Sequence, residues 1–368
     1  MQVIDADAHV EESVHTWQFL DSSFDTRRPL PVTVTLDTNW GTFNGFWIID
    51  DKMRQCGATP TSAQAAKNKN KEGITIPSQE LTDPAARLAD LDQLGIEKQV
   101  IYPTLWLICL AEDADLEIAL AKSYNEFMAK QCGQSGGRLW YAAIIPFRRP
   151  QAAVEEIRRV KRMGGAASIF IRGIEWDMPL NHPSFFPIYE EAERQNLAIA
   201  VHLGMGSPTI TRMLEGTPRI TEPHFSWVPA RALSLNTNLL VQCGFSCLME
   251  GGLLINTFPK LRWVFLEAGS EWTVSAVKAL SHSAKQDFRR YFAEGRIFVG
   301  CEPYEDLSYV TKYLGEDCLV VGSDFPHLDD FRHDRLEQAF RNRGDLSERF
   351  IEKILSENPA KLYGGIQD

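Results

Sequence analysis

The sequence lacks a disulfide framework. It has seven cysteines, an odd number, and none of the Cys-x2-Cys pairs from which structural zinc sites are built. A chain of 368 residues buries a core large enough to stay folded without cross-links. We therefore expect free thiols in a reducing compartment, since disulfides persist where the environment is oxidising.

Long apolar runs and an excess of positive charge are also missing. No run approaches the roughly 18–20 apolar residues of a membrane-spanning helix, and the amino terminus shows no basic segment followed by an apolar one. The formal net charge of −11 argues against a basic nucleic-acid-binding face and against an anionic membrane surface. We expect a cytoplasmic protein that acts on a small molecule, with neither nucleic acid nor membrane as partner.

What the sequence does contain is a series of eight short apolar runs, each with a polar residue near its carboxyl end. Runs of four to eight apolar residues indicate strands that are buried on both faces. Helical patterns lie between most of them, and strand followed by helix about eight times predicts a parallel α/β barrel. The runs are 3–9, 98–103, 139–147, 166–173, 197–204, 262–269, 296–303 and 318–327.

Two gaps between these runs are too long for a simple strand–helix step. They predict insertions at about 10–95, after the first strand, and at about 205–261, after the fifth, which we expect to cover the carboxyl-terminal mouth of the barrel. No internal repeat or linker is visible, so we predict a single domain over residues 1–368: a distorted (β/α)8 TIM barrel. The second insertion holds an apolar helical stretch over 230–254, which would suit a homodimer interface.

The first run places three ionisable side chains on one face. Strand side chains alternate, so Asp5, Asp7 and His9 point the same way while Ala6 and Ala8 point the other. Burying three such groups is costly unless something compensates them. A divalent metal is the simplest compensation, because carboxylate and imidazole are its usual ligands. The alternative, an aspartate that caps a loop, leaves His9 unexplained.

His202 and Asp324 end the fifth and eighth runs. Alone, such a histidine is more often a satisfied core residue, and such an aspartate often caps the next helix. Barrel enzymes, however, place their catalytic groups at the carboxyl ends of strands. Because Asp7, His9, His202 and Asp324 all fall at such ends, together they predict a metal-dependent active site.

Four motifs carry a resemblance to a known family. They are DADAH at 5–9, VHLG at 201–204, FPKLRWVFLEAG at 258–269 and VGSDFPH at 321–327. The chain resembles the amidohydrolase superfamily over almost its whole length, specifically the amidohydrolase-2 branch of decarboxylases, hydrolases and hydratases. The resemblance implies a metal-dependent barrel enzyme.

The resemblance also implies a ligand set. The family's opening His-x-His falls on Asp7 and His9, its strand-five histidine on His202, and its strand-eight aspartate, which binds metal and moves protons, on Asp324. Decarboxylases of this branch have Gly-His-x-Gly at strand six, where this chain has no histidine and instead carries Glu267. Glu12 adds another nearby carboxylate. The predicted metal ligands are therefore Asp7, His9, Glu12, His202, Glu267 and Asp324.

Three reactions remain open on this site. We favour a hydrolase of a small organic substrate, aromatic or carboxylated, in which the metal activates water, Asp324 moves the proton and His327 assists as a second catalytic residue. A dinuclear nonheme iron or iron–manganese oxygenase is the alternative if Glu12 and Glu267 both bind metal. A nonoxidative decarboxylase comes third, because the strand-six histidine is absent. The ion would be zinc, iron or manganese, one or two per chain; a barrel kept only as a binding protein is a fourth, non-enzymatic option.

Overall fold

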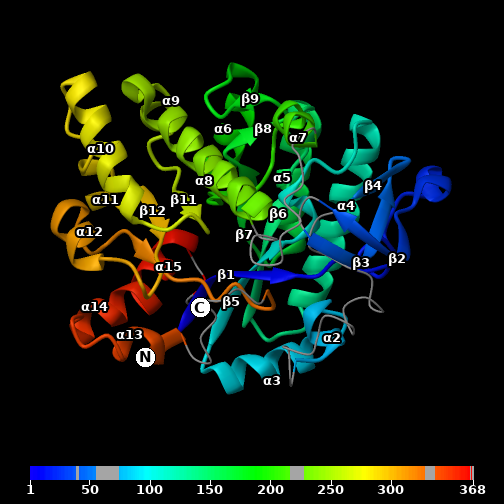
Figure 1. Ribbon diagram of the computed structural model, residues 1–368, viewed down its shortest axis with the longest axis horizontal. Coiled ribbons are helices and arrows are strands. Elements are labelled where there is room, and N and C mark those ends of the chain that lie inside the picture. The colour runs from blue at the N-terminus through cyan, green and yellow to red at the C-terminus, as the bar shows by residue number, and fades with distance from the viewer. Residues whose placement is uncertain (39–40, 55–73, 216–227, 328–335, 365, 367–368) are drawn as a thin grey trace.

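Eight parallel strands form the centre of the molecule in the computed structural model, which describes residues 1–38, 41–54, 74–215, 228–327, 336–364 and 366 (Figure 1). Each strand pairs with the next one along the barrel. All eight strands expected from the apolar runs are present, which confirms the predicted (β/α)8 barrel. They are β1 (Ile4–Val10), β5 (Lys98–Pro103), β6 (Leu139–Ile144), β7 (Ala166–Arg172), β10 (Ala198–His202), β11 (Trp263–Leu266), β12 (Ile297–Gly300) and β13 (Leu319–Val320).

The barrel closes between β1 and the chain that follows β13. Backbone hydrogen bonds join Ala6 N to Val321 O at 2.9 Å and Asp324 N to Asp7 O at 2.9 Å. Gly322 lies between them, and a Cβ atom there would approach Asp7 O to 2.9 Å and Asp7 Cβ more closely still. A glycine is therefore needed where the eighth segment meets the strand that carries Asp7 and His9.

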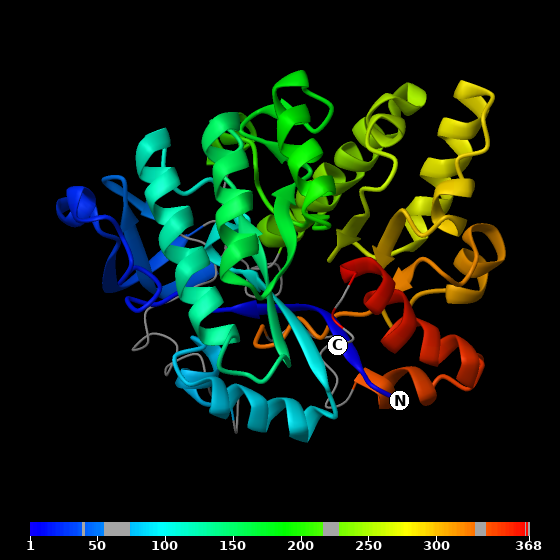
Figure 2. The same cartoon turned by 180° about the vertical axis from the view of Figure 1, so that it is seen from behind.

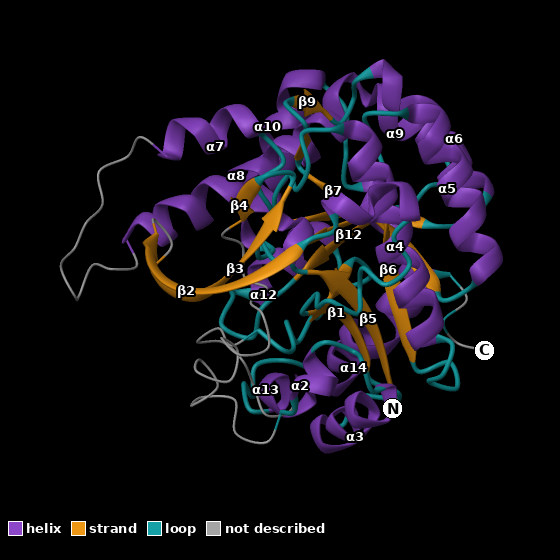
Figure 3. Cartoon of the chain, turned by 90° about the vertical axis from the view of Figure 1, so that its right-hand side faces the viewer, coloured by secondary structure: helices purple, strands orange, loops and turns teal. Residues whose placement is uncertain are grey.

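Helices surround the strands, and several lie side by side along the outer wall (Figures 2 and 3). Sequence signals set their ends: α3 starts after the N-cap Asp83, whose carboxylate accepts from Ala85 N at 3.0 Å, and stops at Gly95 with φ 72°. The barrel helices are α3 (Pro84–Leu94), α4 (Ala114–Cys132), α5 (Pro150–Met163), α6 (Phe186–Arg194), α10 (Glu271–Ala284), α11 (Arg290–Ala293), α12 (Leu307–Leu314), α13 (Leu336–Arg341), α14 (Glu348–Glu352) and α15 (Asn358–Tyr363).

Short helical turns complete this wall: η3 (Leu105–Leu107) after β5, η4 (Pro183–Phe185) before α6, and a π-helical turn η6 (Lys353–Glu357) between α14 and α15. Two-residue strands β8 (Ile174–Glu175) and β9 (Met178–Pro179) pair antiparallel just after β7. The pattern over 275–292 predicts one helix, which is wrong: the chain leaves the helix at Lys285, with φ 52°, and α11 begins at Arg290.

The first insertion contains a small antiparallel sheet that the sequence reasoning did not predict. It comprises η1 (Ser22–Arg27), β2 (Leu30–Thr38), β3 (Gly41–Ile49), β4 (Lys52–Arg54) and, later, α2 (Ile76–Gln79). The Asp50 carboxylate accepts hydrogen bonds from Glu112 N at 2.8 Å and Asp113 N at 3.1 Å, just before α4. Arg27 pairs with both Asp50 and Asp113. The sheet is thus held against the loop that follows β5, on the carboxyl-terminal side of the barrel.

The second insertion is helical, as expected, and comprises α7 (Pro208–Glu215), α8 (Val228–Met249), η5 (Glu250–Gly252) and α9 (Leu253–Thr257). Helix α8 contacts β7, β10 and β11. By length and composition the stretch Asn238–Thr257 could cross a membrane, but half of its apolar window is buried within the protein. At Gly173 a Cβ atom would overlap the Leu240 carbonyl, so the helix approaches the strand end through a glycine. The six described cysteines are free thiols.

Candidate metal centre

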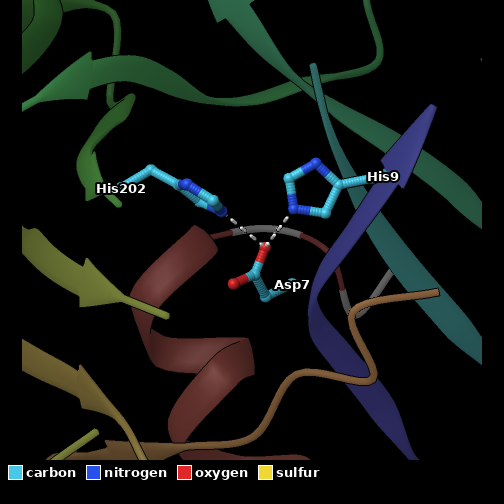
Figure 4. Close-up of side chains that lie close together, drawn as sticks. All are labelled: Asp7, His9 and His202. Carbon is cyan, nitrogen blue, oxygen red and sulfur yellow. Dashed lines mark hydrogen bonds and ion pairs between the residues drawn. The ribbon is translucent and has the colours of Figure 1, made fainter. Parts of the chain in front are cut away.

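Three buried side chains meet at the carboxyl ends of β1 and β10. Asp7 and His9 lie two residues apart on β1, and His202 is the last residue of β10. Figure 4 shows an Asp7 carboxylate oxygen between the two imidazole rings. Asp7 Oδ1 is 3.2 Å from His202 Nε2 and 3.8 Å from His9 Nε2. The structure thus brings together three of the predicted ligands.

The spacing of these atoms suits a bound cation. Ligands that sit about 2.0–2.2 Å from a divalent ion are separated from one another by roughly 3–3.5 Å, close to the distances seen. His9 Nε2 is buried and has no hydrogen-bond partner in the described part of the chain, while Nδ1 lies 3.2 Å from Pro103 O. A ring that donates through Nδ1 presents the Nε2 lone pair to a metal. The residues present therefore fit a divalent ion.

The two histidines differ in their surroundings. Burial lowers the pKa of His9 well below its usual value, and His327 and His202 lower it further, which favours the neutral form that binds metal. Burial also disfavours the charged form of His202, but the charge and hydrogen bond of Asp7 outweigh it and raise the pKa of His202 to about 9. His202 Nδ1 lies 2.8 Å from Leu203 O, which fixes the ring with Nε2 toward Asp7.

Asp324 and His327 extend the site from the loop after β13. Asp324 Oδ1 is 3.4 Å from His9 Nε2 and 2.9 Å from His327 Nδ1. The His327 ring stacks on His9, with centroids 4.1 Å apart. Asp324 has φ 52°, a left-handed conformation that is uncommon for residues other than glycine and is concentrated at functional sites. Both predicted catalytic residues therefore lie beside the three buried ligands.

Glu267 lies on the other side of His202. Its Oε2 is 3.6 Å from His202 Nδ1, the nitrogen that faces away from Asp7, and its backbone also has a positive φ of 57°. Arg172, the last residue of β7, is buried in an ion pair with Glu175. Among the described residues, the two groups of converging ligand atoms are Asp7–His9–His202 and His9–Asp324–His327; Glu267 belongs to neither.

Glu12, predicted as a metal ligand, lies apart from the converging ligand atoms. Its two carboxylate oxygens accept hydrogen bonds from Thr104 N at 3.1 Å and Leu105 N at 2.9 Å, at the end of β5. Burial raises the pKa of Glu12 to about 8. Glu12 is absent from both groups of converging ligand atoms in the described chain. Glu12 anchors the loop after β5, because two backbone N–H groups of that loop donate to its carboxylate. A buried carboxylate needs such hydrogen-bond partners.

A buried polar network under the site was missed by the sequence reasoning. Alternation along a strand predicts that Asp5 shares a face with Asp7, but the register of β1 shifts between Asp5 and Ala8. Asp5 accepts from Ser323 N at 2.8 Å and from Gln99 Nε2 at 2.7 Å. Burial raises the pKa of Asp5 to about 6, against these hydrogen bonds. Arg87 donates to Gln99 Oε1 at 2.8 Å and to His9 O at 2.9 Å. The network ties β1, β5 and the strand-eight segment together. Its only signal in the sequence was the alternation of ionisable residues with alanines in β1, which includes Asp5.

Fold and site together define a metal-dependent (β/α)8-barrel enzyme. A family model described as amidohydrolase matches residues 4–365, so the chain belongs to the amidohydrolase family. Curated relatives are named as decarboxylases. The gamma-resorcylate decarboxylase of Rhizobium sp. (strain MTP-10005) is 22% identical over 258 residues, 65% of this chain and 76% of the relative. The 2-amino-3-carboxymuconate-6-semialdehyde decarboxylase of Dictyostelium discoideum is 21% identical over 294 residues, 77% of each chain.

Solved structures share the fold. The amidohydrolase map2389c from Mycobacterium avium subsp. paratuberculosis K-10 superposes with a TM-score of 0.77, at 18% identity, over 99% of each chain. A dihydroxybenzoic acid decarboxylase from Polaromonas sp. JS666, with bound manganese and the inhibitor 2-nitroresorcinol, superposes with a TM-score of 0.58. It is 18% identical and covers 82% of this chain and 91% of its own. At these identities the likeness concerns the fold.

Proposed function

We propose that this protein is a metal-dependent, nonoxidative decarboxylase of a small unsaturated or aromatic acid. The observation that carries the proposal is the adjacency of a buried ligand set, Asp7, His9 and His202, to the Asp324–His327 pair. The sequence alone favours hydrolysis. Curated relatives that span most of this barrel are named decarboxylases, and this support moves the decarboxylase from the third alternative to the first.

The ligands for the ion are, in this proposal, Asp7, His9, His202 and Asp324. When bound, a divalent metal polarises oxygens of the substrate and neutralises their negative charge. The acid–base chemistry then falls to the chain itself. Asp324 and His327 supply it at the mouth side, where their side chains are 22% and 18% exposed, whereas His9 and His202 are fully buried.

The reaction needs one proton delivered to carbon. Protonated Asp324 gives its proton to the carbon that bears the carboxylate, and the bond between that carbon and the carboxylate then breaks. Carbon dioxide leaves, and the bonding electron pair stays with the substrate and restores its unsaturation. Asp324 is left ionised and regains a proton through His327, whose Nδ1 is 2.9 Å away. Histidine at strand six is not required in this sequence of steps, since His327 brings an imidazole from strand eight.

The test is carbon dioxide release in heavy water. Protein freed of metal and reloaded with manganese or zinc is incubated with 2,6-dihydroxybenzoate and a panel of related phenolic and unsaturated acids. We expect carbon dioxide and one deuterium at the carbon that lost the carboxylate. Asp324→Asn should abolish both, whereas Asp345→Asn, in an exposed pair with Arg343, should change neither. Cleavage of esters, lactones or amides without carbon dioxide release would instead support the hydrolase.

The oxygenase remains the second candidate, and it depends on a second ion. Its condition was that Glu12 and Glu267 both bind metal, and the backbone contacts of Glu12 remove the support from one of the two. Metal analysis of protein purified under low oxygen distinguishes the two candidates: two irons, or iron with manganese, would favour the oxygenase.

A further inference from the structure

Thr104 follows the last residue of β5 and contacts His327 across the barrel mouth. Its hydroxyl oxygen lies 2.9 Å from His327 Nε2, and the residue is buried. His327 Nδ1 lies 2.9 Å from Asp324 Oδ1. Both ring nitrogens of His327 therefore have a partner, one after β5 and one after β13, the strands on either side of β1.

These partners specify the tautomer of the ring. A carboxylate only accepts hydrogen bonds, so Nδ1 of His327 carries the hydrogen that points to Asp324. Nε2 of the neutral ring is then an acceptor, and the Thr104 hydroxyl donates to it. A hydroxyl can make this donation, which a carboxylate could not.

Thr104 is itself held in place. Glu12 accepts from the backbone N–H groups of Thr104 and Leu105, which fixes the chain on which the hydroxyl is carried. One face of the His327 ring stacks on His9 with an interplanar angle of 26°. Rotation of the imidazole would break the bonds to Thr104 and Asp324 together.

We infer that Thr104, anchored by Glu12, is a positioning residue that fixes the tautomer and orientation of His327 relative to Asp324. The inference explains two contacts that metal binding leaves without a role: the backbone hydrogen bonds to the Glu12 carboxylate, and the contact between the Thr104 hydroxyl and the His327 imidazole. Its catalytic consequence rests on the proposed function, because there His327 returns the proton to Asp324. Its structural consequence does not depend on the reaction.

The test compares Thr104→Val, Thr104→Ser and a control, Thr311→Val. Thr311 lies on α12, where its hydroxyl bonds Leu307 O at 2.8 Å, away from the site. Nitrogen-15 spectra of the metal-loaded protein, labelled at its eight histidines and assigned with His327→Gln, report the tautomer of His327 directly. We expect Thr104→Val to shift the His327 Nε2 resonance, and Thr104→Ser and the control to leave it at the wild-type position.

Turnover provides the second measurement. Loss of one hydrogen bond at this ring should lower kcat by roughly five- to tenfold in Thr104→Val with KM nearly unchanged, and serine should restore kcat. Glu12→Gln, which puts an amide NH2 against a backbone N–H, should move the same His327 resonance. An unchanged resonance in both Thr104→Val and Glu12→Gln would overturn the inference. If the resonance shifts as expected but no acid is decarboxylated, the proposed function fails and the positioning role stands.

Discussion

The seam that closes the barrel offers a sharp test, because Gly322 lies against the strand that carries the ligands. In Gly322→Ala the new methyl group would sit 2.9 Å from Asp7 O and closer to Asp7 Cβ. Ordinary carbon contacts are about 3.5–4.0 Å, so β1 and the strand-eight segment would have to part by roughly 1 Å. The seam hydrogen bonds, 2.9 Å long at Ala6 N and Asp324 N, would then be stretched beyond bonding range.

The expected loss of stability follows from those two effects. Overpacking costs about 1–3 kcal/mol, and losing two seam hydrogen bonds adds about 0.5–1.5 kcal/mol each, so we expect the free energy of unfolding to fall by about 2–6 kcal/mol. Asp7 would move with the seam. Because metal sites tolerate ligand shifts of only about 0.2 Å, affinity for the ion should fall by about 10- to 100-fold.

Urea unfolding and metal titration measure both quantities. Gly300→Ala on β12 is the matched control, since the nearest atoms to its Cβ would be at 3.5 Å, an ordinary contact. We expect the control to be unchanged or up to about 1 kcal/mol more stable. If Gly322→Ala unfolds at the same urea concentration as wild type and binds metal equally well, the reasoning about the seam is refuted.

Three further predictions concern the site and its anchor. His202→Ala and Asp324→Ala should each lose metal or activity, as measured by metal content and turnover. If both variants keep full metal content and full turnover, the site assignment is wrong. Chelation should lower the Tm of wild type, and added metal should restore it, whereas His202→Ala should respond to neither. For Glu12, whose pKa is raised to about 8 by burial, the folded state keeps a proton that the unfolded state releases. The resulting stabilisation is complete below about pH 4.5 and is lost as pH rises through about 8. Relative to Glu12→Gln, the unfolding free energy of wild type should therefore fall by at least about 1 kcal/mol between pH 5 and pH 8; parallel pH profiles would contradict this.

The barrel strands were predictable because burial on both faces leaves a continuous apolar run in the sequence. Even β13, only two residues long, was found, since the motif that follows it extends the run to His327. The sheet β2–β3–β4 was not found. The connection between β3 and β4 is Asp50-Asp51, both at positive φ, and this pair is a weaker signal for a tight turn than Asn-Gly or Asp-Gly.

The predicted ligands converge where strand geometry positions them, and Glu12, whose contacts come from a distant loop, lies apart from them. Asp7 and His9 share a face because strands alternate, and His202 ends a strand that the apolar pattern defines. Glu12 looks the same in sequence whether a metal or a pair of backbone N–H groups satisfies it. The donors come from Thr104 and Leu105, more than ninety residues later, and the sequence around Glu12 gives no sign of them.

The same contacts lead to an expectation about the number of ions. His202 faces Asp7 through Nε2, while its Nδ1 lies 2.8 Å from Leu203 O and 3.6 Å from Glu267. Glu267 and Asp7 lie at opposite edges of the imidazole. Because Nδ1 donates a hydrogen bond to the Leu203 carbonyl, it cannot also bind a metal. His202 therefore does not connect Glu267 to the ion that its Nε2 and Asp7 would hold. We therefore expect one metal per chain, retained in Glu267→Gln and lost in His202→Ala. Two metals in wild type with one in Glu267→Gln would reverse this conclusion and make the oxygenase the favoured reaction.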